Sequence, residues 1–360
     1  MEDHSKYIRS CFKLAKKGKS RVSPNPFVGA VLVKNGKVIG KGYHKKFGAA
    51  HAEVNAIKNS TEDVTGSTLY CNLEPCCHTN KQTPPCVPLI IQKKIKRVVI
   101  SNPDPNKEVD GKGVEQLREA GIEVISGILE DEGKVLNKFY FKYAQEKIPF
   151  ITLKIAQSID GKISLSKKEQ TWLTGKESIK YVHKLRSKYD AVLVGANTVK
   201  VDDPLLTVRD VKGRNPIRIV IDGKLSIPLN SNILNTNDPD KTWIFTSQNS
   251  NQRKLKQLEK KGVKVFSVKT AANGRLNLKS VLKVIAKNRI SSVLVEGGQE
   301  IFSQFFSQKL FDELIVLQSP KILGKGLSGF NSTQLKNLPL LETNRLGQDT
   351  KLVYGKKLSD

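Results

Sequence analysis

Two stretches, HAEVNAIKNS (His51–Ser60) and EPCCHTNKQTPPC (Glu74–Cys86), decide the fold of the amino-terminal half of the chain. The first is typical of a helix start, and the second follows an apolar strand and ends where another helix is expected. Together the two stretches supply one imidazole, that of His51, and two thiolates, those of Cys76 and Cys86. Catalytic zinc uses three protein ligands and keeps its fourth position for water, whereas structural zinc uses four. We therefore expect these three residues to bind Zn²⁺.

Glu53 follows the expected histidine ligand by two residues and is the expected proton carrier. Zinc deaminases carry H-x-E followed by P-C-x-x-C, with the glutamate as general acid and base. This chain departs from that pattern, because nine residues separate Cys76 from Cys86. Zinc lowers the pKa of its water from ~15.7 toward ~7, and Glu53 would pass the water's proton to the leaving ammonia. Two alternatives stay open: Cys77 in place of Cys76, and His78 as a fourth ligand that would close the site.

The composition indicates a globular chain of two domains. It has 360 residues, 38% hydrophobic and 26% charged, which is too long for one ordinary core. It has no apolar run of ~18 residues that could span a membrane and no signal peptide at its start, so we expect a cytoplasmic protein. The five cysteines fall in the first quarter, where a metal or catalytic cluster is a better interpretation than disulfides. Whether the chain forms a homo-oligomer is left open.

The net charge of +27 is shared by both halves of the chain. Lysines spread over helix surfaces explain this charge, and a groove for a polyanion is the alternative interpretation. In either case the positive charge would favour the binding of phosphorylated ligands.

The order of apolar segments predicts an α/β fold in both halves. Asn35-Gly36 joins two apolar runs and predicts a hairpin with a type I′ turn. Alternating helices and strands follow, which predicts a sheet with helices on both faces. The pattern restarts after Ala144–Phe150, so we expect domains 1–146 and 147–360, the second with a largely parallel sheet. The stretch GKGLSG (Gly324–Gly329) matches a dinucleotide fingerprint, but no suitable helix or acid follows it, so we reject that interpretation.

Several longer motifs resemble those of the bifunctional deaminase/reductase family of riboflavin biosynthesis. SPNPFVGAVLV, GYH, HAEVNAI, LEPCCHTNKQTPPC and SNPDPN are similar to its deaminase. LKIAQSIDGKI, TWLTG, VGANTVKVDDPLLTVR, PIRIVID and VEGG are similar to its reductase. The resemblance implies a cytidine-deaminase-like α/β/α domain followed by a dihydrofolate-reductase-like α/β domain. It implies zinc-dependent deamination of 2,5-diamino-6-(5-phosphoribosylamino)pyrimidin-4-one, then NADPH-dependent reduction of the ribose to ribityl.

The resemblance also implies binding residues. In the deaminase these would line the phosphorylated pyrimidine: Asn25, His44, His78, Lys81 and Thr83. For Lys81, a solvated loop lysine is the alternative. In the reductase the substrate residues would be Lys154, Gln170, Arg186, Leu206, Arg209 and Glu296. The cofactor residues would be Ala156, Trp172, Thr198, Asp202, Gly297, Gly298, Gln299 and Glu300.

Some of these assignments also have a physical argument. Lys154 sits in a strand that looks buried, so it should face a cleft and an anionic partner. Arg186 and Arg209 could pair bidentately with a phosphate, or be surface arginines. The turn at Gly297-Gly298 precedes a helix whose free N–H groups could receive a pyrophosphate; a plain strand–helix turn is the alternative. Asp202 and Glu296 are the candidate proton donors of the reductase.

Two rival functions share the zinc pattern. A nucleic-acid deaminase, such as a tRNA adenosine deaminase, would use the positive charge, but it has no need of a second α/β domain. It would also want aromatic residues at its entrance, and aromatics make up only 6% of the chain. A zinc-stapled RNA-binding module would not need Glu53 or an open coordination position. We therefore expect a small phosphorylated substrate and no nucleic-acid partner.

Overall fold

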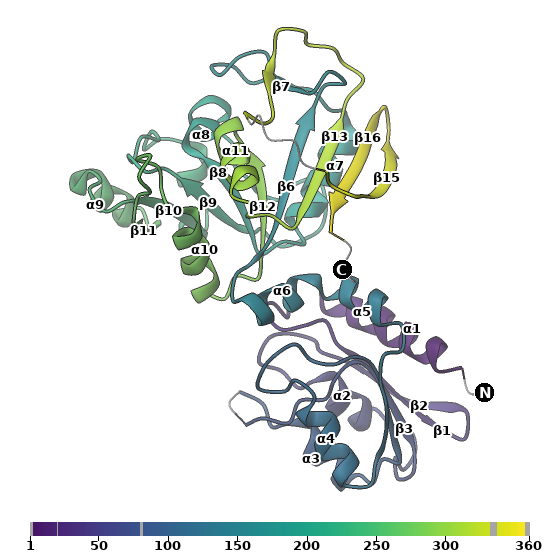
Figure 1. Cartoon of the computed structure of the whole chain (residues 1–360). Coiled ribbons are helices and arrows are strands. Elements are labelled where there is room, and N and C mark those ends of the chain that lie inside the picture. The colour runs from purple at the N-terminus through teal and green to yellow at the C-terminus, as the bar shows by residue number, and fades with distance from the viewer. Residues whose placement is uncertain (1–2, 20, 80–81, 332–336, 357–360) are drawn as a thin grey trace. The chain divides into compact units, whose positions relative to one another are not determined.

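A computed structural model describes residues 3–19, 21–79, 82–331 and 337–356. These residues form two compact units, divided in the sequence between Lys147 and Ile148 (Figure 1). Within the described ranges, each helix is too short or too polar to cross a bilayer.

The described residues of the amino-terminal unit form a five-stranded sheet in the order β2-β1-β3-β4-β5. Its strands are β1 (Gly29–Lys34), β2 (Lys37–Tyr43), β3 (Thr68–Leu73), β4 (Arg97–Asn102) and β5 (Glu123–Ile125). Strand β1 is antiparallel to β2 and β3, and β3, β4 and β5 are parallel. Asn35 and Gly36 have φ of 50° and 73°, as a type I′ turn requires. The predicted hairpin is confirmed.

Helices cover both faces of this sheet. They are α1 (His4–Ala15), α2 (Ala52–Lys58), α3 (Cys86–Gln92), α4 (Lys112–Glu119), α5 (Glu130–Leu136) and α6 (Lys138–Glu146). Apolar side chains of α2, α3 and α4 pack on one face, and those of α1 and α5 pack on the other. This is the predicted α/β/α arrangement. Cys11 and Cys71 are fully buried in it, as expected for apolar cysteines.

The carboxyl-terminal unit has a larger sheet. Its described residues form nine strands in the order β11-β10-β9-β8-β12-β6-β13-β16-β15, with a separate ribbon of β7 and β14. The strands are β6 (Phe150–Gln157), β7 (Lys162–Ser164), β8 (Ala191–Gly195), β9 (Ile217–Ile221), β10 (Thr242–Ser247), β11 (Lys264–Val268), β12 (Ser292–Gly297), β13 (Glu313–Gln318), β14 (Leu327–Ser328), β15 (Leu340–Leu346) and β16 (Asp349–Gly355). All pairs in the large sheet are parallel except β13–β16 and β15–β16. The predicted parallel-dominated sheet is confirmed.

Helices again cover both faces of this sheet. They are α7 (Lys176–Arg186), α8 (Ala196–Asp202), α9 (Gln252–Lys260), α10 (Leu278–Lys287) and α11 (Gln299–Ser307). Side chains of α10 and α11 pack on one face, and those of α8 and α9 on the other. The carboxyl ends of β6, β8, β9 and β12 meet at one edge, where ligands bind in open parallel sheets. In the rejected fingerprint, Leu327 and Ser328 form β14 and pair with β7.

Candidate active sites

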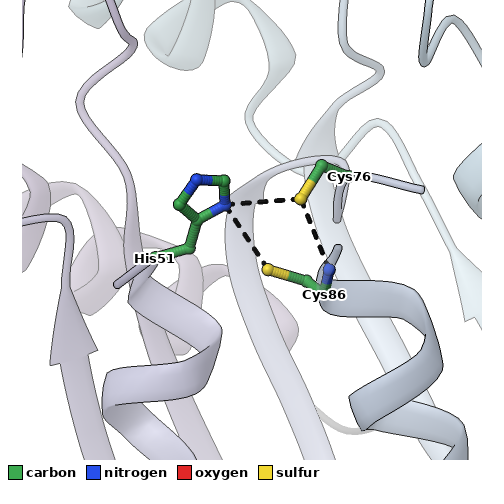
Figure 2. A group of neighbouring side chains, drawn as sticks. All are labelled: His51, Cys76 and Cys86. Carbon is green, nitrogen blue, oxygen red and sulfur yellow. Dashed lines mark hydrogen bonds between the residues drawn. The ribbon is translucent and has the colours of Figure 1, made fainter. Parts of the chain in front are cut away.

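Figure 2 shows His51, Cys76 and Cys86 converging on one point of the amino-terminal unit. The imidazole Nδ1 of His51 lies 3.3 Å from Sγ of Cys76 and 3.5 Å from Sγ of Cys86. A tetrahedral zinc with Zn–N of ~2.0 Å and Zn–S of ~2.3 Å places nitrogen and sulfur about 3.5 Å apart. One imidazole and two buried sulfurs at these distances therefore fit a zinc ion.

Local backbone structure holds the three donors in place. His51 is the N-cap of α2, and Cys86 is the first residue of α3. The carbonyl of Cys76 accepts hydrogen bonds from the N–H groups of Cys86 and Val87, at 2.9 and 3.2 Å, which ties the loop after β3 to the start of α3. The N–H of Cys86 also points at Sγ of Cys76, at 3.4 Å. Backbone N–H groups at a helix start favour the thiolate form that metal binding requires.

Thr83 fixes the orientation of the histidine. Its Oγ1 lies 3.1 Å from Nε2 of His51, the ring nitrogen that faces away from the sulfurs. With Nδ1 acting as the metal ligand, Nε2 carries the proton, and this N–H donates a hydrogen bond to the threonine hydroxyl. A partner of this kind sets the tautomer and the ring angle of a metal-binding histidine. Sequence reasoning had placed Thr83 against the substrate.

Among the described residues, the cluster of metal donors contains neither Cys77 nor His78. Both of these side chains approach Glu108 instead. Sγ of Cys77 lies 3.9 Å from its carbonyl oxygen, and Nδ1 of His78 lies 3.7 Å from its carboxylate. The geometry thus favours Cys76 over Cys77 and leaves the cluster at three donors.

Glu53 follows the cluster's histidine in α2, and two further predicted residues lie beside that histidine. Glu53 lies in the first turn of α2 and is only 3% exposed. The ring of His44 packs edge-on against His51, with 5.4 Å between centroids, and its Nε2 lies 3.3 Å from Nδ2 of Asn25. Burial lowers the pKa of His44, so this ring is neutral near pH 7. Lys81 lies outside the described residues.

A pocket of about 830 Å³ opens at the carboxyl ends of the strands in the second unit. This volume lies within the range of about 300–1,000 Å³ that is usual for ligand and cofactor sites. Most residues predicted for the reductase line it: Lys154, Ala156, Gln170, Trp172, Arg186, Thr198, Asp202, Arg209, Glu296, Gly297, Gly298, Gln299 and Glu300. Leu206 does not line it, because its side chain packs into the apolar core that contains Val199 of α8.

A buried ion cluster lies in this pocket. The guanidinium of Arg186 donates to both carboxylate oxygens of Glu296, at 2.7 and 2.8 Å. Nζ of Lys154 lies 3.4 Å from the same carboxylate. Burial alone would raise the pKa of Glu296, but the two cations outweigh it and hold that pKa at about 2. Lys154 therefore has the anionic partner expected from sequence, and Arg186 makes an ion pair that was not expected.

The glycines at the end of β12, Gly297 in the strand and Gly298 after it, are required by their surroundings. A Cβ on Gly297 would lie 2.9 Å from Oγ1 of Thr198, and Gly298 has φ of 88°. Gly298 is the N-cap of α11 and offers no side-chain cap. The first N–H groups of this nine-residue helix are therefore available to an anion in the pocket.

Comparisons with known proteins agree for both units. Residues 1–102 match the model of the cytidine and deoxycytidylate deaminase zinc-binding region, and residues 149–352 match the model of the RibD C-terminal domain. The riboflavin biosynthesis protein RibD of Aquifex aeolicus is 46% identical over 89% of this chain and 88% of its own. The chain belongs to the RibD family.

Solved RibD structures share the architecture. Acinetobacter baumannii RibD has a TM-score of 0.89 at 33% identity, over 98% of both chains. A Thermotoga maritima diaminohydroxyphosphoribosylaminopyrimidine deaminase/5-amino-6-(5-phosphoribosylamino)uracil reductase has a TM-score of 0.84 at 38% identity, also over 98% of both. Like other RibD proteins, this chain is a bifunctional deaminase and reductase of riboflavin biosynthesis, with Zn²⁺ and NADPH as cofactors. The comparisons do not favour a tRNA deaminase.

Two further acids position loops in the RibD deaminase unit. The carboxylate of Glu74 accepts hydrogen bonds from the N–H groups of Asp104, Gly111 and Val114, at 3.0 to 3.1 Å, and so holds the loop after β4. Burial raises the pKa of Asp104 to about 6, although the Tyr140 hydroxyl donates to it at 2.7 Å. Both acids come shortly after an apolar strand in the sequence.

Sequence reasoning missed His183 of the RibD reductase unit. Its Nδ1 accepts a hydrogen bond from the N–H of Arg209 at 3.1 Å, and its Nε2 lies 3.3 Å from the carboxylate of Asp210. This histidine lines the pocket from α7 and ties the Arg209 loop to that helix. Its partners lie 26 and 27 residues away in the chain, and spacing along a helix gives no sign of them.

Proposed function

We propose that residues 1–146 deaminate 2,5-diamino-6-(5-phosphoribosylamino)pyrimidin-4-one, and that residues 147–360 reduce the ribose of the resulting aminouracil to ribityl. The product would be 5-amino-6-(5-phosphoribitylamino)uracil. The Thermotoga maritima relative is named for the substrates of these two reactions. The observation that carries the deaminase assignment is the approach of His51 Nδ1 to two sulfurs, with Glu53 in the adjoining helix turn.

His51, Cys76 and Cys86 would hold the zinc. Bound there, zinc supplies a Lewis acid that makes water a nucleophile near neutral pH. Glu53 takes the proton from the attacking water and delivers it to the leaving amine. Thr83 keeps Nδ1 of His51 turned toward the sulfurs. Asn25, neutral His44, His78 and Lys81 bind the pyrimidine and its phosphate, since amides and imidazoles can read ring edges.

NADPH supplies the hydride for the second reaction. The turn at Gly297-Gly298 and the first residues of α11, Gln299 and Glu300, would receive its pyrophosphate. Ala156, Trp172, Thr198 and Asp202 would contact the rest of the cofactor. Gln170, the backbone at Leu206, and Arg209 would bind the substrate, with Arg209 on its phosphate.

The ion cluster divides the remaining roles in the reductase. Glu296 stays ionised at neutral pH because Arg186 and Lys154 hold its pKa low, so it orients these cations and does not donate a proton. Arg186 keeps the carboxylate in place through two hydrogen bonds. Of the two candidate acids, Asp202 is the better one, because burial raises its pKa while Lys154 only partly opposes this.

The partner of this protein is then a small phosphorylated pyrimidine, met in the cytoplasm, and not a nucleic acid. Three cysteine and histidine donors arranged for a metal favour a reducing compartment. Adding RNA should leave both activities unchanged. A tight complex with RNA that weakens steeply with salt would contradict this part of the proposal.

The direct test incubates purified full-length protein with the diaminopyrimidine phosphate, with and without NADPH, and follows products by mass spectrometry. Without NADPH, we expect exchange of one amino group for a hydroxyl. With NADPH, we expect the further addition of a hydride and a proton. Reduction without prior deamination would contradict the proposed order of the reactions. The absence of both changes would contradict the proposed reactions themselves.

A further inference from the structure

The reductase pocket extends beyond the groups that the proposed reaction uses. Lys154 lies on β6 and Glu296 on β12, near the centre of the sheet, while β9 and β11 lie farther out beyond β8. The pocket continues along the loops that follow these outer strands. A dinucleotide whose pyrophosphate meets α11 and whose nicotinamide lies near Lys154 therefore has its adenosine directed to these loops.

Lys224 follows β9 and lines this outer part of the pocket. It is exposed, and no hydrogen bond or ion pair of its side chain is seen among the described residues. Its charge is therefore available to a ligand.

The acid next to Lys224 is already engaged. Asp222 is 2% exposed, and its carboxylate accepts hydrogen bonds from the Ser226 hydroxyl at 3.0 Å and the N–H of Ile227 at 2.9 Å. In dinucleotide sites, an acid after a strand binds the ribose 2′-hydroxyl of NAD, and a nearby arginine accommodates the 2′-phosphate of NADP. Because Asp222 closes its own turn, it cannot serve as a ribose ligand, and the turn presents the cation of Lys224 instead.

Arg275 lines the same part of the pocket from the loop between β11 and α10. A bridge between Thr270 and Leu276 and a tight turn at Gly274, with φ of 73°, form this loop into a small hairpin. The guanidinium lies 3.9 Å from the carboxylate of Glu300 in the first turn of α11, and both side chains are about half exposed or more. Arg275 thus lies near the start of α11, and this long exposed contact holds its guanidinium weakly.

The two cations come from loops that touch. A Cβ built on Gly223 would lie 3.5 Å from Cδ2 of Leu276, so the residues next to Lys224 and Arg275 are in van der Waals range. We propose that Lys224 and Arg275 form the subsite for the 2′-phosphate of NADPH and make this reductase prefer NADPH to NADH. A phosphate monoester carries about −1.5 to −2 charge near neutral pH, and a guanidinium can hold it with two hydrogen bonds. The inference rests on the proposed placement of the cofactor.

The test measures binding, not turnover. Isothermal titration calorimetry of the full-length protein gives Kd for NADPH, NADH, 2′,5′-ADP and 5′-AMP. We expect Lys224→Ala and Arg275→Ala each to raise the Kd of NADPH and of 2′,5′-ADP by about tenfold or more, as loss of a hydrogen bond to a charged group does. The Kd of NADH and 5′-AMP should change by less than about twofold, since neither carries the 2′-phosphate.

Lys279→Ala is the matched control, because Lys279 is an exposed lysine of α10 that does not line the pocket. It removes the same charge and should leave every Kd unchanged. An unchanged NADPH-to-NADH ratio in the Lys224→Ala/Arg275→Ala double variant would overturn the subsite, as would equal weakening of both dinucleotides. Loss of selectivity in Lys200→Ala alone would also overturn it, because Lys200 lines the pocket from α8. If the wild type binds neither dinucleotide, the cofactor placement itself fails.

Discussion

Arg186 donates two hydrogen bonds to Glu296 across 110 residues of sequence, at 2.7 and 2.8 Å, and Lys154 approaches the same carboxylate. The three charges are largely buried, with side-chain exposures of 12%, 5% and 11%. One carboxylate thus holds two cations at the reductase pocket. Removing the carboxylate would leave both of them without their nearest anion.

Glu296→Gln should therefore destabilise the carboxyl-terminal unit by about 3–5 kcal/mol and abolish reduction, while deamination continues. Urea unfolding and separate assays of the two reactions check this. Glu342→Gln is the control, because Glu342 pairs with Lys351 at 2.8 Å but is 53% exposed. It should cost less than about 1 kcal/mol. An equal loss of unfolding free energy in the two variants would show that the buried ion cluster stabilises the protein no more than the exposed ion pair does.

Glu53→Gln should retain zinc and lose deamination by about 10²- to 10⁴-fold, the usual contribution of a general acid and base. Zinc content and the rate of the first reaction are measured on the same sample. Reduction of the deaminated intermediate is the internal control and should not change. Loss of zinc from this variant would reassign Glu53 as a ligand.

Thr83→Ala should weaken zinc binding by about 10- to 100-fold, the range found when the partner of a metal-binding histidine is removed. Competition with a chromogenic chelator measures the affinity. Thr83→Ser keeps the hydroxyl that faces Nε2 of His51 and should restore most of it. A threonine that served only the substrate would instead raise KM and leave the zinc affinity of both variants at the wild-type level.

Acid should weaken binding of the reductase substrate through His183. Burial lowers the pKa of His183 below its ordinary 6.5, and Arg186 and Arg209 add to this effect while Asp210 and Glu296 oppose it. A lowered pKa means that the folded protein favours the neutral ring. The stabilisation of the folded state by this neutral ring is therefore present above about pH 6.5 and is lost as the pH falls. Protonation of Nδ1 would remove the acceptor that holds the N–H of Arg209.

The reductase KM should therefore rise between about pH 7 and pH 5 more steeply in the wild type than in His183→Asn, whose Oδ1 can accept in place of Nδ1. Titration of the substrate phosphate affects both proteins alike, so the comparison isolates the histidine. Parallel pH profiles would mean that His183 does not control the Arg209 loop.

The sequence predicted best what is encoded locally. The Asn35-Gly36 turn follows from turn chemistry, and the helix after His51 begins where the sequence predicts it. The three proposed zinc donors could be named from the H-x-E and Pro-Cys motifs, although nine residues separate Cys76 from Cys86. The hairpin of β15 and β16 was missed, because Leu340–Leu346 lies at the sheet edge and is largely exposed, so it shows no alternation of apolar and polar residues.

Long-range pairings could not be predicted in the same way. The sequence indicated that Lys154 needs an anion, but the strand order that brings Glu296 of β12 beside β6 emerges only when the sheet forms. For the same reason Arg186 was expected to bind phosphate, whereas its guanidinium is engaged by Glu296. The choice of proton donor for the reductase depends on these contacts, because the pKa of Asp202 is raised whereas that of Glu296 is lowered.

The zinc content of the purified protein tests the central claim most directly. Elemental analysis of wild-type protein that is active in deamination should find about one zinc ion per chain. Cys86→Ser should lose both zinc and deamination, while Cys77→Ser, which removes the neighbouring thiol outside the donor cluster, should keep both. Full deaminase activity in protein that contains no zinc would contradict the account.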